Sequence, residues 1–235
     1  MQTPTAFLTM EQVLAQWQHC MWAHTLSGEQ AAQLVHPQLR LRHVRAGQHL
    51  WHSGDAPQGW IGVLRGAAKI CVPTEDGRSI TLCGYAGSWF GETYLLRPGA
   101  RMDCDAIALH PLTMLTLPTN AFHALRQAAP AFSQFLLELM AERTHQLMRL
   151  LTAQQCTGVT SRVAQCLGSL VTPMNFPFPD AGLLNITQSE LADFCQVSRA
   201  RFNEALLELE KQQFVEVGYR SVRLKDIDGL RRYGA

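Results

Sequence analysis

Short apolar runs separated by turn signals fill residues 41–117, and this pattern most constrains how the chain can fold. Glycines and Asp-Gly pairs recur there about every ten residues. Such residues favour tight turns in which φ is positive. Regularly spaced short strands of this kind predict an antiparallel barrel or roll. The turn signals are Ala46-Gly47, Ser53-Gly54-Asp55, Arg65-Gly66, Asp76-Gly77, Ala86-Gly87, Pro98-Gly99 and His110-Pro111.

Residues 1–36 are expected to be helical. Thr9 with Gln12, and Ser27 with Gln30, fit the capping box, in which a side chain and the backbone satisfy each other's unpaired groups. Apolar residues recur between these two boxes at helical spacing and form one face. They are Met10, Val13, Leu14, Trp17 and Met21.

A long helix is expected to begin at Pro130, because neither Gly nor Pro follows until Gly158. Residues spaced alternately four and three apart predict a coiled-coil seam that pairs two copies of the chain. The seam residues are Leu136, Met140, Arg143, Leu147, Leu150 and Gln154, with Arg143 at a position where an apolar residue is usual. The alternative is that this stripe packs on the chain's own barrel.

Residues 187–212 predict a helix-turn-helix. Thr187 and Glu190 form another capping box that starts a short helix through about Cys195. Ser198 is a good N-cap for a second helix that runs to about Gln212. Two helices joined by so short a turn are typical of this motif. The segment "FVEVGYRSVRL" that follows predicts two short strands, a wing.

The start of the second helix carries side chains that can read base edges. Arg bonds guanine bidentately, Asn suits adenine and Glu accepts from cytosine. The candidate DNA-binding residues are Thr187, Gln188, Ser198, Arg199, Ala200, Arg201, Asn203, Glu204 and the wing residue Arg220. Residues 183–235 hold eight Lys and Arg against eight Asp and Glu, so basic groups must be concentrated on one face.

Four stretches together resemble the cyclic-AMP receptor/FNR (Crp-Fnr) superfamily of bacterial transcription regulators. They are the Gly47 to Gly77 turn ladder, "GSWFGE" at residues 87–92, "VTSRVAQCL" at 159–167 and "ITQSELADFCQVSRARFNEALLELE" from Ile186. The resemblance implies an α+β fold with an N-terminal antiparallel β-roll (a cyclic-nucleotide-binding-like jelly roll), a long dimerisation helix and a C-terminal winged helix-turn-helix. The corresponding domains are residues 1–129, 130–157 and 158–235.

The same resemblance implies a homodimer that binds double-stranded DNA at a near-palindromic operator. It also implies RNA polymerase as a partner if the protein activates transcription. Relatives often carry Glu where Ala200 stands and a second Arg where Glu204 stands, so the preferred operator is expected to differ from the usual one.

The effector region departs from the family pattern. Cyclic-AMP-binding members follow the Gly-Glu pair, here Gly91-Glu92, with an adjacent Arg-Ser that holds the cyclic phosphate. Met102-Asp103 stand in that place, and Arg101 comes one residue early. Asp103 and Asp105 would repel a phosphate at close range. We therefore expect an effector other than cyclic AMP, with a constitutive DNA-binding dimer or a haem- or redox-gated regulator as alternatives.

Other cofactors have weaker signals. An iron–sulfur cluster needs several cysteines close together, and the N-terminal region has only Cys20. Haem needs one or two axial ligands, and six residues could supply them: His19, Cys20, His24, His43, His49 and His52. Thiol chemistry could involve Cys71, Cys83, Cys104 or Cys156, although buried free thiols are the usual case.

The amino-acid composition excludes some classes of protein but does not indicate a function. The net charge of +1 indicates neither a nucleic-acid nor a membrane partner. There is no apolar run of membrane-spanning length and no signal peptide, and seven scattered cysteines favour a reducing cytoplasm. The spacing of His49 and His52 differs from the His-x-His of cupin metal sites, so no metal site is predicted. No nucleophile motif, P-loop or acid pair indicates an enzyme.

Overall fold

The computed structural model describes residues 8–15, 17, 20, 22–73, 79–85, 88–155, 158–171 and 182–234, giving backbone alone for 73 and 79–85. The chain forms two compact units, which divide within the long helix α5 (Pro130–Gln154) between Glu138 and Leu139. The first unit comprises most of the chain before that point, and the second most of the chain after it. Each unit is described by itself.

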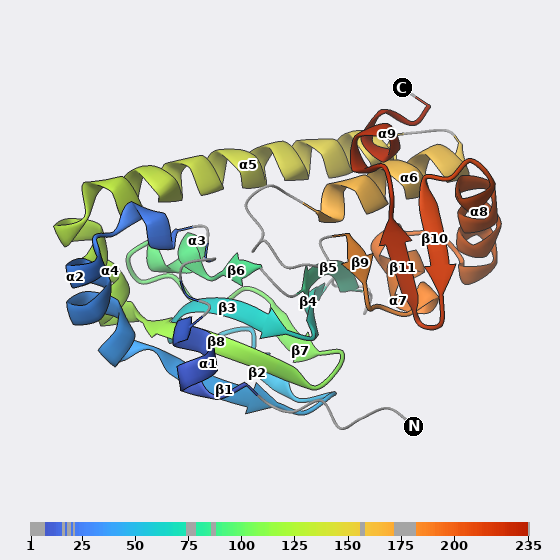
Figure 1. The fold of residues 1–235 in the computed structure, drawn as a ribbon. Coiled ribbons are helices and arrows are strands. Elements are labelled where there is room, and N and C mark those ends of the chain that lie inside the picture. Colours follow the sequence, from blue (N-terminus) through green and yellow to red (C-terminus); the bar gives the residue numbers. More distant parts are fainter. Residues whose placement is uncertain are drawn as a thin grey trace. The chain divides into compact units, whose positions relative to one another are not determined.

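The first unit is built around two four-stranded antiparallel sheets (Figure 1). One sheet has the order β1 (Arg40–Val44), β8 (Leu112–Pro118), β3 (Gly59–Arg65), β6 (Trp89–Phe90). The other has the order β2 (His49–Trp51), β7 (Asp105–Ala108), β4 (Ala67–Pro73), β5 (Ser79–Tyr85). One apolar cluster takes side chains from both sheets, among them Val63 and Ala106. The predicted antiparallel β-roll is confirmed.

The turns of this roll lie where the glycines predict them. Gly47, Gly54 and Gly66 have φ of 80°, 90° and 86°, in the left-handed region that favours glycine. The predicted turns at Gly77 and Gly87 lie outside the described residues.

The N-terminal segment is helical but broken into short pieces. These are α1 (Met10–Ala15), η2 (Ala23–Thr25), α2 (Gly28–Gln30), the π-helical η3 (Ala31–Val35) and η4 (His36–Gln38). Both predicted capping boxes form. The indole of Trp22 lies 5.0 Å from that of Trp60 and 5.3 Å from the ring of Phe132, so this segment packs on both β3 and α5.

Two further helices belong to the first unit, α3 (Glu92–Leu95) and α4 (Thr119–Ala128). The long helix α5 begins at Pro130 as predicted. No helix in the described part of the chain has the length and apolar character required to cross a bilayer.

The second unit is a small helical bundle with a three-stranded sheet (Figure 1). Its helices are α6 (Val159–Leu170), α7 (Gln188–Phe194), α8 (Arg199–Lys211) and α9 (Ile227–Arg232). The sheet has the order β10 (Val215–Gly218), β11 (Ser221–Leu224), β9 (Leu183–Leu184). The predicted winged helix-turn-helix is confirmed.

Candidate functional site

Side-chain caps fix the ends of the two helices of the motif. Thr187 Oγ1 accepts from Glu190 N at 3.3 Å, and Glu190 Oε2 accepts from Thr187 N at 3.0 Å. Ser198 Oγ accepts from Arg201 N at 3.4 Å. Each cap satisfies a backbone donor that a helix start leaves unpaired. The predicted positions of both helix starts are confirmed.

A backbone hydrogen bond and buried apolar side chains hold the turn between the two helices. Gln196 has a φ of 54°, and Val197 N donates to Ala192 O at 3.1 Å. Apolar side chains from both helices are buried beneath the turn, namely Leu191, Ala192, Cys195, Phe202, Leu206 and Leu209. The Cys195 thiol shares a hydrogen bond with Cys166 of α6, and this bond lowers the pKa of Cys166. This bond joins the end of α7 to α6.

The first turn of α8 presents the predicted reading face. Arg199, Ala200, Arg201 and Glu204 are exposed. Asn203 differs, because its Oδ1 is buried and has no hydrogen-bond partner among the described residues. The predicted group is thus brought together, except that the amide oxygen of Asn203 does not face solvent.

The wing exposes an aromatic residue that the sequence analysis missed. Tyr219 and Arg220 form the two-residue turn between β10 and β11, and Gly218 pairs with Ser221. Tyr219 is 88% exposed, and Arg220, also exposed, has a φ of 54°. The sequence shows a Tyr between Gly218 and Arg220, but its exposure follows from its place at the tip of the wing.

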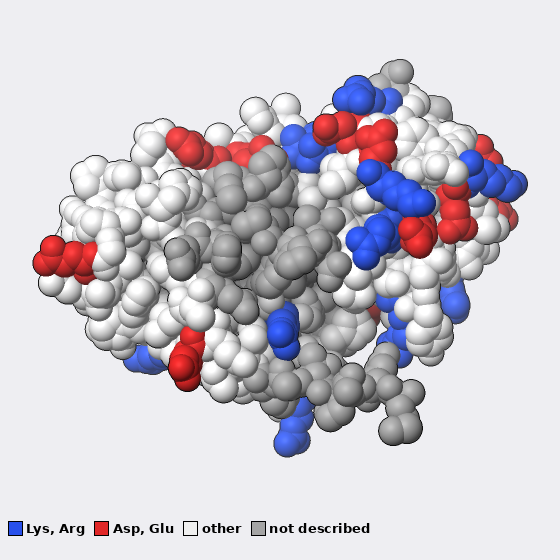
Figure 2. All heavy atoms as spheres, in the orientation of Figure 1, with Lys and Arg blue, Asp and Glu red and all other residues white. Residues whose placement is uncertain are grey.

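Charge on the second unit is mixed. Figure 2 shows Lys and Arg interspersed with Asp and Glu over the part of its surface that faces the viewer. Because the second unit has equal numbers of basic and acidic residues, DNA binding requires the basic ones to gather on one face. The face seen in Figure 2 is not such a basic patch. Three basic side chains of the motif and its wing, Arg199, Arg201 and Arg220, are exposed and can contact phosphates.

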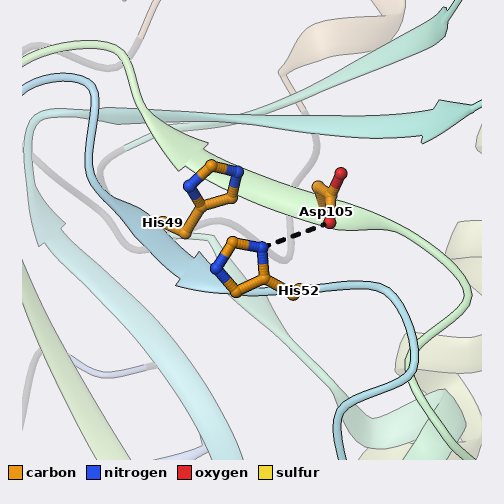
Figure 3. Close-up of side chains that lie close together, drawn as sticks. All are labelled: His49, His52 and Asp105. Carbon is orange, nitrogen blue, oxygen red and sulfur yellow. Dashed lines mark ion pairs between the residues drawn. The ribbon is translucent and has the colours of Figure 1, made fainter.

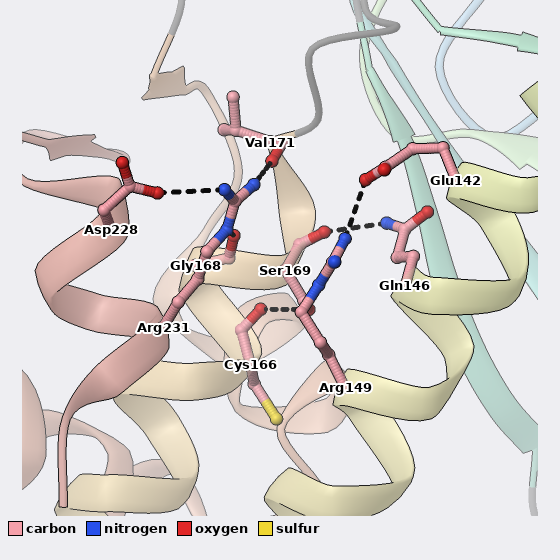
Figure 4. A network of polar contacts seen from close by, with 9 residues as sticks. All are labelled: Glu142, Gln146, Arg149, Cys166, Gly168, Ser169, Val171, Asp228 and Arg231. Atoms are coloured by element: carbon pink, nitrogen blue, oxygen red, sulfur yellow. Dashed lines mark hydrogen bonds and ion pairs between the residues drawn. The ribbon is translucent and has the colours of Figure 1, made fainter. Parts of the chain in front are cut away.

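Polar side chains close the C-terminal end of α6, whose last carbonyls lack helical partners. Arg231 of α9 donates from Nε to Gly168 O at 3.0 Å and from Nη2 to Val171 O at 2.6 Å (Figure 4). Gln146 of α5 donates from Nε2 to Ser169 O at 2.7 Å. Arg149 pairs with Glu142 on the same helix at 2.8 Å. The second half of α5 is therefore tied directly to the helix that supports the reading helices.

The effector segment of the first unit begins at Gly91, which caps α3 with a φ of 102°. A Cβ at this position would lie 3.1 Å from Gly59 O, so glycine suits both the conformation and the space. The carboxylate of the next residue, Glu92, is buried and accepts from Trp60 Nε1 at 2.9 Å. Glu92 therefore contacts the aromatic cluster of Trp60 rather than solvent.

The other predicted pocket residues do not share one surface with Glu92. Met102 is buried in the apolar core, whereas Arg101 and Asp103 are exposed. Arg101 Nη1 donates to Gly54 O at 2.8 Å, and the Tyr94 hydroxyl donates to Asp103. Burial and the bond to Asp103 raise the pKa of Tyr94 above its usual range. Arg101 is thus engaged by a backbone carbonyl.

The residues considered for iron–sulfur or haem binding are scattered. Cys20 is buried, and burial raises the pKa of its thiol, so the thiolate that a metal needs is disfavoured. His24 is exposed, and His43 Nδ1 lies 3.2 Å from Thr113 Oγ1. His19 and Cys156, and the side chain of Cys83, lie outside the described residues. The rings of His49 and His52 are stacked, with their centroids 4.0 Å apart.

The exposed side of α5 is offset from the predicted seam. Leu136, the first predicted seam residue, is buried in the single chain, and Met140, Arg143 and Leu150 are half-buried. A stripe one residue further along is exposed throughout, with the same alternating spacing. This exposed stripe consists of Leu137, Ala141, Thr144, Met148, Leu151 and Gln155. Leu147 and Gln154 of the predicted seam are also exposed.

Comparison with known proteins agrees with this architecture. The cyclic nucleotide-binding domain family matches residues 41–129, and the Crp-like helix-turn-helix domain family matches residues 161–233. The cAMP-activated global transcriptional regulator CRP of Pasteurella multocida is 26% identical over 168 residues, covering 71% of this chain and 80% of that protein. The CRP-like cAMP-activated global transcriptional regulator of Mycobacterium tuberculosis is 27% identical over 192 residues, covering 79% and 84%.

A solved structure with the same fold is that of FixK2 from Bradyrhizobium japonicum. Its TM-score is 0.67 at 16% identity, over 84% of this chain and 98% of that one. A cyclic-nucleotide-binding β-roll joined to a Crp-like helix-turn-helix defines a DNA-binding transcription regulator. The chain belongs to the Crp-Fnr family of such regulators.

Proposed function

We propose that the protein is a homodimer that binds a near-palindromic operator through α8 and responds to an effector other than cyclic AMP. The observation that carries the DNA-reading part is the exposure of Arg199, Ala200 and Arg201 on the first turn of a capped helix. In helix-turn-helix proteins this turn enters the major groove and its side chains reach base edges. The protein acts as a regulator rather than an enzyme, in the cytoplasm where its DNA partner lies.

The exposed side chains of the motif would make different contacts with DNA, according to their positions. Arg199 and Arg201 are placed to bond guanine or phosphate, and Glu204, one turn on, can accept from cytosine. Thr187, Gln188 and Ser198 lie at the two helix starts, where hydroxyl, amide and backbone N–H groups can bond phosphate. On the wing, Arg220 and Tyr219 extend this surface.

Dimerisation is supported by the exposed stripe of α5. Its members repeat at the spacing of a two-stranded coiled coil, and Leu137, Met148 and Leu151 are 66%, 61% and 62% exposed. So many large apolar side chains on one helix face indicate burial by a partner, and a second copy offers a matching stripe. Two copies would place two α8 helices on successive major grooves, about 34 Å apart.

The absence of a cyclic-AMP response is supported by how the effector segment is used. Binding of a cyclic phosphate needs an unopposed cation, but Arg101 is bonded to Gly54 O and Asp103 lies two residues away. Glu92 is bonded to Trp60, whose ring lies 5.6 Å from Phe132 of α5. A ligand shifts a conformational equilibrium only if it binds the two conformations with different affinities. An effector that prefers one arrangement of Glu92 and Trp60 would therefore also favour one conformation of the neighbouring α5.

A gel-shift experiment tests the DNA-reading part. A duplex enriched from random sequence by the wild-type protein is titrated with Arg199→Ala and with the control Arg232→Ala, an exposed arginine on α9. Loss of a bidentate base contact costs about 1–3 kcal/mol, and a dimer loses one in each half-site, so Arg199→Ala should bind at least about 30-fold more weakly. The control should bind as wild type does. Equal affinity of both variants would refute the assignment of α8.

A further inference from the structure

Three potential metal ligands lie together on the β-roll of the first unit. They are His49 of β2, His52 just after it and Asp105 of β7 (Figure 3). One ligand atom from each lies within 4.8 Å of the others, and His52 Nδ1 is 3.8 Å from Asp105 Oδ1. The imidazoles of His49 and His52 are stacked, with centroids 4.0 Å apart and planes at 26°.

A strand irregularity brings the two histidines to one face. In β2, His49 pairs with Ile107 and Trp51 with Ala106, so the register shifts between them. Leu50 and Trp51 are consequently both buried, and His49 and His52 remain on the outer side. Regular alternation would have placed His49 and Trp51 on the same side.

Asp105 is fixed in place while the histidines are free to adjust. Ser53 N donates to Asp105 Oδ1 at 2.8 Å, which orients the carboxylate and leaves Oδ2 for a ligand. The side chain of His52 is 61% exposed, so it can turn without losing packing. Within the described part of the chain, no hydrogen bond engages the ring nitrogens of His49.

We propose that His49, His52 and Asp105 bind one divalent transition-metal ion of the zinc type. Zinc takes histidine nitrogen and carboxylate oxygen at about 2.0–2.2 Å in a tetrahedron, so its ligand atoms stand about 3.3 Å apart. Closing the present separations therefore needs a movement of roughly 1–1.5 Å, which rotation of exposed His52 provides. Two imidazoles and one carboxylate leave the fourth position to water or to a further ligand.

Cys71 lies on the same face of the sheet as Asp105. It pairs directly with Asp105 in the β4–β7 register, and residues directly opposite in a ladder project to the same face. Cys71 is half-buried there. Thiolate is a strong zinc ligand, so movement of the Cys71 side chain toward the ion would let it replace the water.

Metal binding at this site would act on the effector segment. The turn after β2 is already joined to that segment, since Gly54 N donates to Met102 O at 2.7 Å and Met102 N to Asp55 O at 2.9 Å. A metal bridging His52 and Asp105 adds a stronger link between the same two chain segments. This regulatory consequence rests on the proposed function, whereas metal binding does not.

Calorimetric titration of the chelator-treated full-length protein with Zn²⁺ tests the site. One equivalent should bind. His52→Gln and Asp105→Asn should each weaken binding by more than about 10-fold, the lower limit of what loss of an outer-shell partner costs. The control His24→Gln removes an exposed histidine elsewhere on the first unit and should change nothing. Because His52 is exposed and Asn retains the acceptor for Ser53 N, both variants should keep the wild-type circular dichroism.

Substitution by Co²⁺ identifies the ligands. Loss of the visible d–d bands of Co²⁺ in His49→Gln and Asp105→Asn supports the site, whether or not a thiolate charge-transfer band marks Cys71. Unchanged Zn²⁺ affinity in the folded His52→Gln and Asp105→Asn variants would overturn the proposal, as would no binding to wild type. DNA affinity is measured in a separate experiment. A negative result for metal binding therefore leaves the DNA-binding proposal intact, and a negative result for DNA binding leaves the metal site intact.

Discussion

Replacement of Leu151 by Ala is expected to weaken the dimer. Leu151 belongs to the exposed stripe of α5 and is 62% exposed in a single chain. In a coiled-coil pair it would lie against its own copy, where both side chains are removed from water. The substitution keeps a good helix former, so α5 itself should remain intact.

The size of the effect follows from the exposed fraction. Full burial of a leucine side chain is worth about 1.5–3 kcal/mol, so burying the 62% that is exposed contributes about 0.9–1.9 kcal/mol per chain. A two-fold symmetric dimer contains the substitution twice, so the free energy of dimerisation should be reduced by roughly 2–4 kcal/mol per dimer. The dimer dissociation constant should therefore rise on the order of 100-fold.

Sedimentation equilibrium over a range of concentrations measures this constant. Leu207→Ala is the matched control, because Leu207 is 58% exposed but lies on α8. It should dimerise as wild type does. A dissociation constant for Leu151→Ala that equals that of Leu207→Ala would refute the stripe as the dimer contact, and a larger effect of Leu150→Ala would restore the seam predicted from the sequence.

Three further outcomes are expected. Arg231→Ala should lower the free energy of unfolding of the second unit by about 1–3 kcal/mol in urea, because Gly168 O and Val171 O lose their donor, and Arg232→Ala should not. Trp60→Phe should destabilise the first unit by a similar amount, roughly 1–3 kcal/mol, since buried Glu92 loses its indole partner, and an unchanged melting temperature would contradict this role. Cyclic AMP should give no calorimetric signal and no change in melting temperature, and micromolar binding would show that Arg101 can leave Gly54.

The helix-turn-helix could be predicted from the sequence because its signals are local. Thr187 with Glu190, and Ser198 before Arg199, fix helix starts within three or four residues, and the structure has both caps. The helical period alone was enough to assign the apolar residues around Phe202 to the core. Tyr219 was missed because exposure at a turn tip depends on the whole wing.

The seam could not be fixed to one residue from spacing alone. Leu136 and Leu137 are adjacent, and both begin stripes with the same alternating spacing. An α-helix has 3.6 residues per turn, so neighbouring stripes differ by only about 100° around the axis. Leu136 is buried in the single chain whereas Leu137 is exposed, and this difference leaves no mark in the helical period.

The effector region and the histidine cluster depend on contacts between distant segments. Glu92 and Trp60 are 32 residues apart, and no spacing rule joins a carboxylate to that indole. His49 and His52 reach one face through a register shift in β2, and Asp105 arrives from β7 by strand pairing. From the sequence, His49 and His52 are candidates only for haem or a His-x-His metal site, and Asp105 only for repelling a phosphate, because no spacing rule joins Asp105 to the two histidines.

The most direct test of a dimeric, sequence-reading α8 is selection of duplexes from random DNA by the wild-type protein and by Arg199→Ala. For the wild type we expect an inverted repeat whose half-sites are about 34 Å, or 10–10.5 base pairs, apart between centres. For Arg199→Ala we expect the preference to relax at one base pair in each half-site. An enriched sequence without inverted symmetry, or identical sequences for both proteins, would contradict the account.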